Sequence, residues 1–183
     1  MNIDWMALIK AWTNRLDNSG DAEKFRAYAM TLLDAPYVWG SENPEGTDCS
    51  GTVCFPLWLL GYNIRVTANV LYKELFTVKP VDKGDLSKIM AVFYITKVAK
   101  NHGGTMVPAG TATHVTPVVG KNVVLNAFDK IRLDTAESVR QYFESRDSFA
   151  EWREIDLNKA RSMSFRMAYA WNVDPVLQLI REI

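Results

Sequence analysis

Three residues far apart in the chain have the types needed for nucleophilic catalysis by a thiol: Cys49, His114 and Asn126. A thiolate attacks a carbonyl carbon, an imidazole can take the thiol proton, and an amide oxygen can hold that imidazole in one tautomer by accepting its second N–H. Cysteine, histidine and asparagine in this order form a candidate cysteine-peptidase triad. We therefore predict that Cys49 is the nucleophile, His114 the general base and acid, and Asn126 the residue that orients the imidazole.

The residues around the cysteine predict that it lies at the start of a helix. An aromatic, glycine-containing and turn-rich run precedes it over 37–47 (YVWGSENPEGT), and Asp48 or Thr47 can cap a helix over 49–60. The positive end of a helix favours a thiolate, and its unpaired N–H groups, that of Cys49 included, can hold an oxyanion. With an imidazolium nearby, we expect a thiolate–imidazolium ion pair.

The histidine and the asparagine fall on two runs that read as a β-hairpin. The runs at 114–119 and 123–128 are apolar and β-branched, and a Gly-Lys-Asn turn separates them at 120–122. His114 opens the first run and Asn126 lies near the end of the second. A hairpin of this spacing places the two side chains next to each other at its open end.

The remaining elements predict an α+β fold. Apolar residues at three- and four-residue spacing predict helices over 3–16, 21–35, 49–60, 67–76 with Thr67 as its cap, and 135–146 with Asp134 or Thr135 at its start. Pro56 predicts a kink or an early end in the third of these. A further strand is expected over 89–96, while 150–156 and 163–171 fit either a strand or a helix. Helices followed by clustered strands are typical of helices packed on an antiparallel sheet.

Length and charge limit the domain count and the class of partner. The chain has 183 residues, 48% of them hydrophobic, which is enough for one core, so we expect a single domain over 1–183. The 21 basic and 21 acidic residues give a formal net charge of zero, which indicates neither nucleic acid nor an anionic membrane as a partner. The oligomeric state is not indicated.

The cysteines and histidines favour neither a disulfide nor a metal site. Cys49 and Cys54 point to different sides of one predicted helix and should not bridge. Two cysteines and two histidines without a CxxC, HExxH or HxH spacing are a poor set of metal ligands, so no metal and no cofactor is expected.

Each candidate residue also has a structural interpretation. Cys49 alone could be a small buried hydrophobe, and Cys54, followed by a phenylalanine, is expected in the core. His102 lies in an Asn-His-Gly-Gly run typical of a solvated loop. Taken alone, His114 would be read as a core histidine, and only its pairing with the other two residues favours catalysis.

Two sequence blocks resemble the NlpC/P60 family of papain-like cell-wall cysteine peptidases. The first is APYVWG followed by GTDCSGTV, and the second is THVTPVVGKNVVLNA; the resemblance runs from about 29 to 127. The resemblance implies the papain-like α+β fold, with a core over about 22–130, an N-terminal helix and a C-terminal extension. It also implies that the chain cleaves peptidoglycan stem peptides, commonly at the bond between γ-D-glutamate and a diamino acid, with neither metal nor cofactor.

The resemblance assigns roles to residues of the two blocks. It makes Cys49 the nucleophile, His114 the base, and Asn126 the orienting residue, at a position where the family more often has histidine. Four residues are implied to contact the substrate: Tyr37 and Trp39 at the wall of the cleft, the former near the oxyanion, and Asp48 and Ser50 in the pocket for the D-glutamyl or amino-terminal end.

The sequence departs from the family pattern in several places. Pro117 stands where a strand residue normally donates a hydrogen bond, so this strand should be at an edge or bulged. Residues 97–110 could form a flap near the cleft. The residues after 130 do not match the family core and are expected to add a terminal subdomain.

The N-terminus lacks a basic start, a long apolar stretch and a small-residue cleavage site, which predicts cytoplasmic synthesis without a signal peptide. A wall-directed enzyme made in this way would need another route, as a phage lysin released through a membrane pore or as a phage tail component. Two alternatives remain open: a non-catalytic module that binds muropeptides or a protein partner, and a cytosolic acyltransferase or amidase of related fold.

Overall fold

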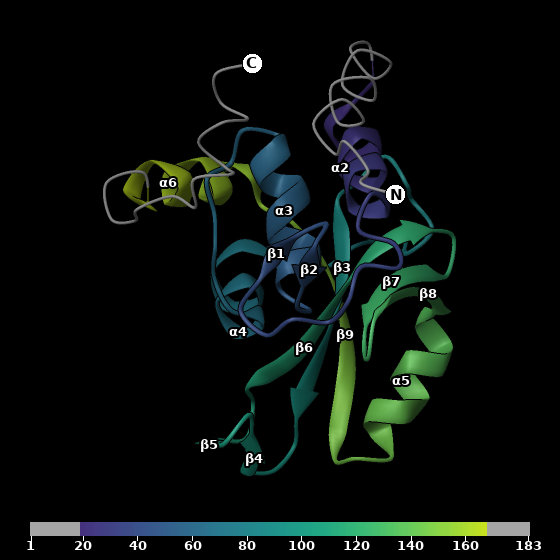
Figure 1. The fold of residues 1–183 in the computed structure, drawn as a ribbon, viewed down its shortest axis with the longest axis vertical. Coiled ribbons are helices and arrows are strands. Elements are labelled where there is room, and N and C mark those ends of the chain that lie inside the picture. Colours follow the sequence, from purple (N-terminus) through teal and green to yellow (C-terminus); the bar gives the residue numbers. More distant parts are fainter. Residues whose placement is uncertain (1–18, 168–183) are drawn as a thin grey trace.

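A computed structural model of the chain describes residues 19–167, and Figure 1 shows their arrangement. Its centre is a five-stranded antiparallel sheet with the strand order β8-β7-β6-β3-β9. The strands are β3 (Met90–Thr96), β6 (Ala112–Gly120), β7 (Val123–Ala127), β8 (Ile131–Thr135) and β9 (Ser148–Glu154). The three runs expected as strands are thus confirmed as β3, β6 and β7. The ambiguous run at 150–156 lies mainly in β9.

Helices cover both faces of the sheet. They are α2 (Asp21–Met30), α3 (Gly51–Leu59), α4 (Ala68–Val70), which continues into the π-helical turn η1 (Leu71–Leu75), α5 (Ala136–Glu144) and α6 (Leu157–Met167). Thr67 caps α4 and Thr135 caps α5, as predicted. The predicted helix over 3–16 lies outside the described residues. None of the helices in the described part of the chain is long and apolar enough to span a membrane.

Strand β3 shows how the sheet divides the core in two. All of its residues are buried, and because side chains alternate across a strand, Phe93 packs on one face and Tyr94 on the other. The Phe93 face meets the apolar sides of α2, α3, η1 and α6. The Tyr94 face meets α5, which Figure 1 shows on its own side of the sheet. The fold is therefore α+β, as predicted.

Residues 131–167 do not form a separate subdomain. Strand β8 pairs with β7 from Val123↔Thr135 to Ala127↔Ile131, and β9 pairs with β3 along its whole length. Both edges of the central sheet thus come from this segment, and α5 joins them. For this part of the chain the expectation of a terminal subdomain is wrong, because short strands with partly exposed side chains carry a weak apolar pattern.

Strand β6 is irregular on the side that faces β7. The ladder between β6 and β7 contains the pairs Val118↔Val124 and Gly120↔Val123, with a register shift between them. Pro117 precedes the first of these pairs and has no N–H to offer. The bulged strand predicted from Pro117 is confirmed, although β6 lies inside the sheet and not at its edge. The two strands therefore separate beyond Val118, toward the end that carries His114.

Two small hairpins lie outside the central sheet. One joins β1 (Glu42–Asn43) to β2 (Gly46–Thr47) just before α3, and the other joins β4 (Lys100–His102) to β5 (Thr105–Val107). The second hairpin lies within the segment predicted to form a flap.

Candidate active site

Asp48 lies just before helix α3, and its hydrogen bonds hold the turn that carries Cys49. The Asp48 carbonyl oxygen accepts from the Thr52 N–H at 3.1 Å, and its Oδ1 accepts from the Gly51 N–H at 2.7 Å and from the Ser50 hydroxyl at 2.8 Å. A side-chain oxygen that accepts from a backbone N–H three residues on resembles an N-cap contact. The structure nevertheless starts α3 at Gly51, two residues later than predicted, with Ser50 at the N-cap position. The helix also continues past Pro56 to Leu59, so the predicted early end is wrong.

The loop before α3 packs so closely that position 51 has room for glycine alone. A Cβ on Gly51 would lie 2.3 Å from the Thr47 Oγ1 and 2.4 Å from the Ser41 carbonyl oxygen. Gly40 has a φ of 80°, which favours glycine, and its N–H donates to Asp48 Oδ2 at 2.8 Å. The glycines of the first block thus let the loop fold tightly around the start of the helix.

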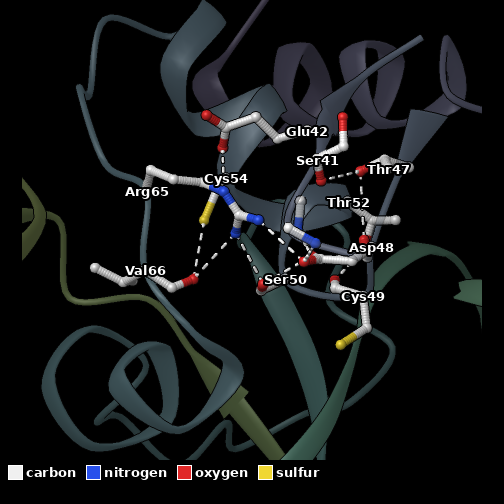
Figure 2. Close-up of polar contacts among 12 residues, drawn as sticks. Ser41, Glu42, Thr47, Asp48, Cys49, Ser50, Thr52, Cys54, Arg65 and Val66 are labelled. Carbon is white, nitrogen blue, oxygen red and sulfur yellow. Dashed lines mark hydrogen bonds and ion pairs between the residues drawn. The ribbon is translucent and has the colours of Figure 1, made fainter. Parts of the chain in front are cut away.

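Arg65 completes this arrangement from the segment after α3, as Figure 2 shows. Its Nη2 donates to Asp48 Oδ2 at 3.0 Å, its Nη1 to the Ser50 hydroxyl at 2.9 Å, and its Nε lies 3.1 Å from Glu42 Oε2. The Asp48 side chain is 9% exposed and that of Arg65 20%. The sequence analysis missed Arg65, because a single arginine outside any motif gives no indication of its partner.

Cys49 is a free, buried thiol. The backbone N–H groups of Val115 and Ser50 lie near its sulfur, which in Figure 2 points away from the Arg65 guanidinium. Burial, and secondarily the charge of Asp48, raises the pKa of Cys49 to about 12 against the opposing effect of these two N–H groups. The thiol is therefore protonated at neutral pH in this structure.

Because β6 and β7 separate, Cys49, just before α3, can pack against the edge of β6. Val115 is opposite Phe93 in the pairing of β6 with β3, but its N–H points to Cys49 and so away from β3. Pro117 lies two residues further on and therefore has its nitrogen on the same side. Because β7 does not pair with β6 in this region, the start of α3 fits against the exposed edge of β6.

His114 and Asn126 lie next to each other, as the hairpin spacing predicts. His114 Nε2 is 2.8 Å from Asn126 Oδ1, and Asn126 Nδ2 donates to Asp134 Oδ2 at 2.8 Å. Since a carboxylate only accepts, Asp134 sets the orientation of the amide, and the Asn126 oxygen must then accept from His114 Nε2–H. The lone pair of the imidazole is thereby left on Nδ1. Arg132 Nε donates to the same Asp134 oxygen, Oδ2, at 2.9 Å.

Aromatic residues pack around the His114 ring on the α5 side of the sheet. The ring stacks on Phe143 with centroids 4.9 Å apart and lies 5.6 Å from Tyr94. Burial lowers the pKa of His114 to about 4, although the hydrogen bond that His114 donates to Asn126 raises it in part. The imidazole is neutral at pH 7.

The thiol and the imidazole do not form an ion pair in this structure. Within residues 19–167 no hydrogen bond joins Cys49 to His114, and the burial of each group favours its uncharged form. The predicted thiolate–imidazolium pair is therefore wrong for this state. The two residues are still close along the sheet, since one N–H that lies near the Cys49 sulfur belongs to Val115, the neighbour of His114.

The predicted site residues line two different hollows. A cavity of about 970 Å³ is lined by Cys49 together with Trp39, Asp48 and Ser50. A smaller one of about 250 Å³ is lined by His114 and Tyr37. Tyr37 lies near both, since burial and the nearby Cys49 and Asp48 raise the pKa of its phenol.

The β4–β5 hairpin forms one wall of the large cavity. His102 and Val107 line it, and the His102 ring lies 5.6 Å from the ring of Trp39, which comes from the loop on the other side. The predicted flap is confirmed, and His102 belongs to it rather than to a solvated loop. Cys54 is fully buried, as predicted. Among the residues that the structure describes, no group of three or more His, Cys, Asp or Glu side chains is arranged to hold a metal ion.

Comparison with known proteins supports the fold prediction. No protein-family model and no curated protein matches the sequence. Among solved structures, the chain is similar to a lipoprotein-like NLP/P60 family protein from Staphylococcus aureus, with a TM-score of 0.56 and 19% identity over 74% of this chain and 41% of that one.

The chain is also similar to two proteins of Trichomonas vaginalis. NlpC1 matches with a TM-score of 0.50 and 20% identity, over 75% of this chain and 44% of the other, and NlpC2 with a TM-score of 0.50 and 22% identity, over 75% and 46%. The chain thus spans less than half of the length of each of these three solved proteins. It has the fold of NlpC/P60 proteins.

Proposed function

We propose that this chain is a cysteine endopeptidase that hydrolyses peptidoglycan stem peptides, with Cys49 as nucleophile, His114 as general base and acid, and Asn126 as the orienting residue. The observation that carries this proposal is the contact between His114 Nε2 and Asn126 Oδ1 beside the strand residue whose N–H reaches Cys49. The NlpC/P60 fold and the two sequence blocks add the substrate class, with the γ-D-glutamyl–diamino acid bond as the expected site of cleavage.

The proposed first step uses the imidazole nitrogen that the Asn126 contact leaves free. His114 Nδ1 takes the proton of the Cys49 thiol as the sulfur leaves the Val115 N–H and attacks the scissile carbonyl carbon. The carbonyl oxygen becomes an oxyanion, which the backbone N–H of Cys49 can stabilise. No described residue accepts a hydrogen bond from that N–H, so it is available for this purpose.

The cycle closes with two proton transfers through the same imidazole. The protonated His114 gives its proton to the leaving amine, and the peptide bond breaks to give a thioester on Cys49. Water then attacks the thioester, with His114 as base, and releases the carboxylate product and the free thiol. Binding of substrate must bring sulfur and imidazole together, because they are not in contact in this structure.

Mass spectrometry of muropeptides digested with the purified protein tests the proposal. We expect two products whose masses sum to that of the substrate plus one water, and no turnover by the Cys49→Ala variant. Cys54→Ala is the matched control and should retain cleavage, since Cys54 is buried in the core and does not line the cavity. Cleavage that persists in Cys49→Ala would rule out the mechanism.

A second candidate is favoured by one observation. The neutral, unpaired thiol and imidazole are also what a non-catalytic module would show if it kept the cleft to bind muropeptides or a protein partner. Such a module would bind muropeptides without releasing products. The digestion described above separates the two candidates. Analysis of the same products would also reveal a cytosolic acyltransferase or amidase, which would leave the stem peptide intact.

A further inference from the structure

Arg65 lines the large cavity and pairs with the carboxylates on its wall. Glu42, Asp48 and Arg65 are the formally charged residues among those that line this cavity, and Arg65 contacts both of the others. It also donates to the Ser50 hydroxyl at 2.9 Å. The Arg65 guanidinium thus contacts Asp48 and Ser50, the two residues next to Cys49 that were predicted to bind the substrate.

The Asp48 carboxylate has no acceptor position left for a ligand. Its Oδ1 accepts from the Gly51 N–H and the Ser50 hydroxyl, and its Oδ2 accepts from the Gly40 N–H and Arg65, all at 2.7–3.0 Å. An ionised carboxylate offers about four lone-pair sites, so these four donors occupy it completely. A substrate ammonium would therefore find no free carboxylate oxygen on Asp48.

Ser50 is only partly occupied. Its hydroxyl donates its single proton to Asp48 and accepts from Arg65, which leaves one acceptor position beside the guanidinium. A substrate ammonium at this place would also approach the guanidinium, and two like charges repel strongly in a partly buried site. Displacing Arg65 would instead break its ion pairs with Asp48 and Glu42, which is costly in a partly buried site.

The rest of the cavity wall suits an uncharged group. Trp39, Val66, Val70 and Ala112 supply apolar surface, and Asn69 is held in place by the Ala112 N–H, which donates to its Oδ1 at 3.2 Å. The amide of Asn69 can still donate through Nδ2. An acyl group with a carbonyl oxygen fits these surroundings better than an ammonium does.

We propose that Arg65 is a specificity-determining residue that closes the Asp48–Ser50 subsite to free amines. The preferred substrate is then a stem peptide whose amino terminus is acylated, as in a stem still joined to its neighbour through an amide bond. This inference rests on the proposed endopeptidase function, but it is a separate statement about which substrates the site accepts.

The test compares two synthetic stem peptides that differ only in acetylation of the amino terminus, each containing a γ-D-glutamyl–diamino acid bond. We expect the wild-type protein to cleave the acetylated peptide with a kcat/KM about tenfold or more above that of the free amine. Arg65→Met should remove this preference, because Asp48 then becomes available to an ammonium. Arg65→Lys, which keeps the charge, should retain the preference for the acetylated peptide.

Arg153→Met is the matched control. Arg153 also pairs with a carboxylate, that of Glu151, and its side chain is 16% exposed, close to the 20% of Arg65, but it does not line the cavity. Its removal should leave the ratio of the two kcat/KM values unchanged. The comparison of the two peptides with the wild-type protein needs no variant. It therefore tests the predicted preference for the acetylated peptide even if Arg65→Met does not fold.

The outcomes separate this inference from the proposed function. Wild-type cleavage that is equal for both peptides, or faster for the free amine, overturns the role of Arg65 and leaves the endopeptidase in place. An unchanged preference in a folded Arg65→Met also overturns it. Cleavage of neither peptide overturns the proposed function and with it the inference.

Discussion

An arginine–aspartate ion pair supports each residue of the proposed dyad, but the two pairs differ in their burial. At the cysteine, Arg65 binds Asp48, and Asp48 holds the turn that carries Cys49; at the histidine, Arg132 binds Asp134, and Asp134 orients Asn126 against His114. The Asp48 side chain is 9% exposed and that of Asp134 22%. Burial therefore makes the first pair part of the fold, while the second mainly sets the orientation of an amide.

The contacts at the cysteine are also more local than those at the histidine. The polar partners of Asp48 lie within residues 40–65, around a single helix start. The His114 ring depends on the register of β6, β7 and β8 and on Phe143 from α5. A nucleophile set by a local turn and a base set by long-range packing can move relative to each other, as a dyad that forms around its substrate requires.

The largest difference between the two sites is expected in protein stability when each aspartate is replaced by asparagine. Asp48→Asn removes the more buried of the two carboxylates that pair with Arg65 and the acceptor of three further hydrogen bonds, and we expect it to reduce the free energy of unfolding by about 3–5 kcal/mol. Asp134→Asn affects a more exposed ion pair and should cost about 1 kcal/mol or less. Urea denaturation of both variants measures the difference. Equal losses would show that burial does not distinguish the two pairs.

Acid should destabilise the protein through His114. Because burial lowers its pKa from 6.5 to about 4, the folded protein binds fewer protons than the unfolded chain between these pH values. This contribution to stability is complete above pH 6.5 and is lost as the pH falls toward 4, by about 3 kcal/mol in total.

A comparison of wild type with His114→Gln isolates this effect. Unfolding free energies measured at pH 7 and pH 4 should fall further in the wild type than in the variant, since glutamine does not titrate. His102→Gln serves as the control, because His102 lies in the outer hairpin and is partly exposed. If the variant and the wild type lose the same stability, His114 is not buried as a neutral imidazole.

The smallest effects, measured on kcat, are expected from substitution of the residues that orient the imidazole. Asn126→Ala removes the acceptor of His114 Nε2–H, and we expect kcat on muropeptides to fall about 100-fold because the tautomer is no longer set. Asp134→Leu leaves Asn126 free to flip and should cost about tenfold. Asn126→His should restore most of the activity, since its ring nitrogen can accept the same proton. An Asn126→Ala variant with wild-type kcat would exclude Asn126 from the mechanism.

The sequence predicted those parts of the site that are local or periodic. The run from Asp48 to Gly51 indicated a helix start, and the structure begins α3 within it, at Gly51. The spacing of His114 and Asn126 indicated a hairpin pair, which was confirmed. These features depend on turn chemistry and on alternation along a strand, which a single sequence displays.

The missed features depend on contacts between distant segments. Arg65 reaches Asp48 only because the chain turns back after α3, at Gly61 with a φ of 92°. Asp134 reaches Asn126 through the register of β8, where Arg132 and Asp134 alternate in a segment that we had assigned to the approach to a helix. The expected ion pair was wrong for a related reason, since burial of Cys49 and His114 outweighs the favourable end of α3.

The pH dependence of Cys49 alkylation by iodoacetamide tests the central claim that the resting dyad is neutral and not preformed. A thiol with a pKa of about 12 should react slowly at pH 7, with a rate that rises about tenfold per pH unit from pH 6 to 10, and His114→Ala should show the same profile. Cys54, which is fully buried, should remain unmodified in the folded protein. Fast alkylation on a plateau below pH 7 that disappears in His114→Ala would contradict the account, because it would demonstrate a thiolate–imidazolium pair in the free protein.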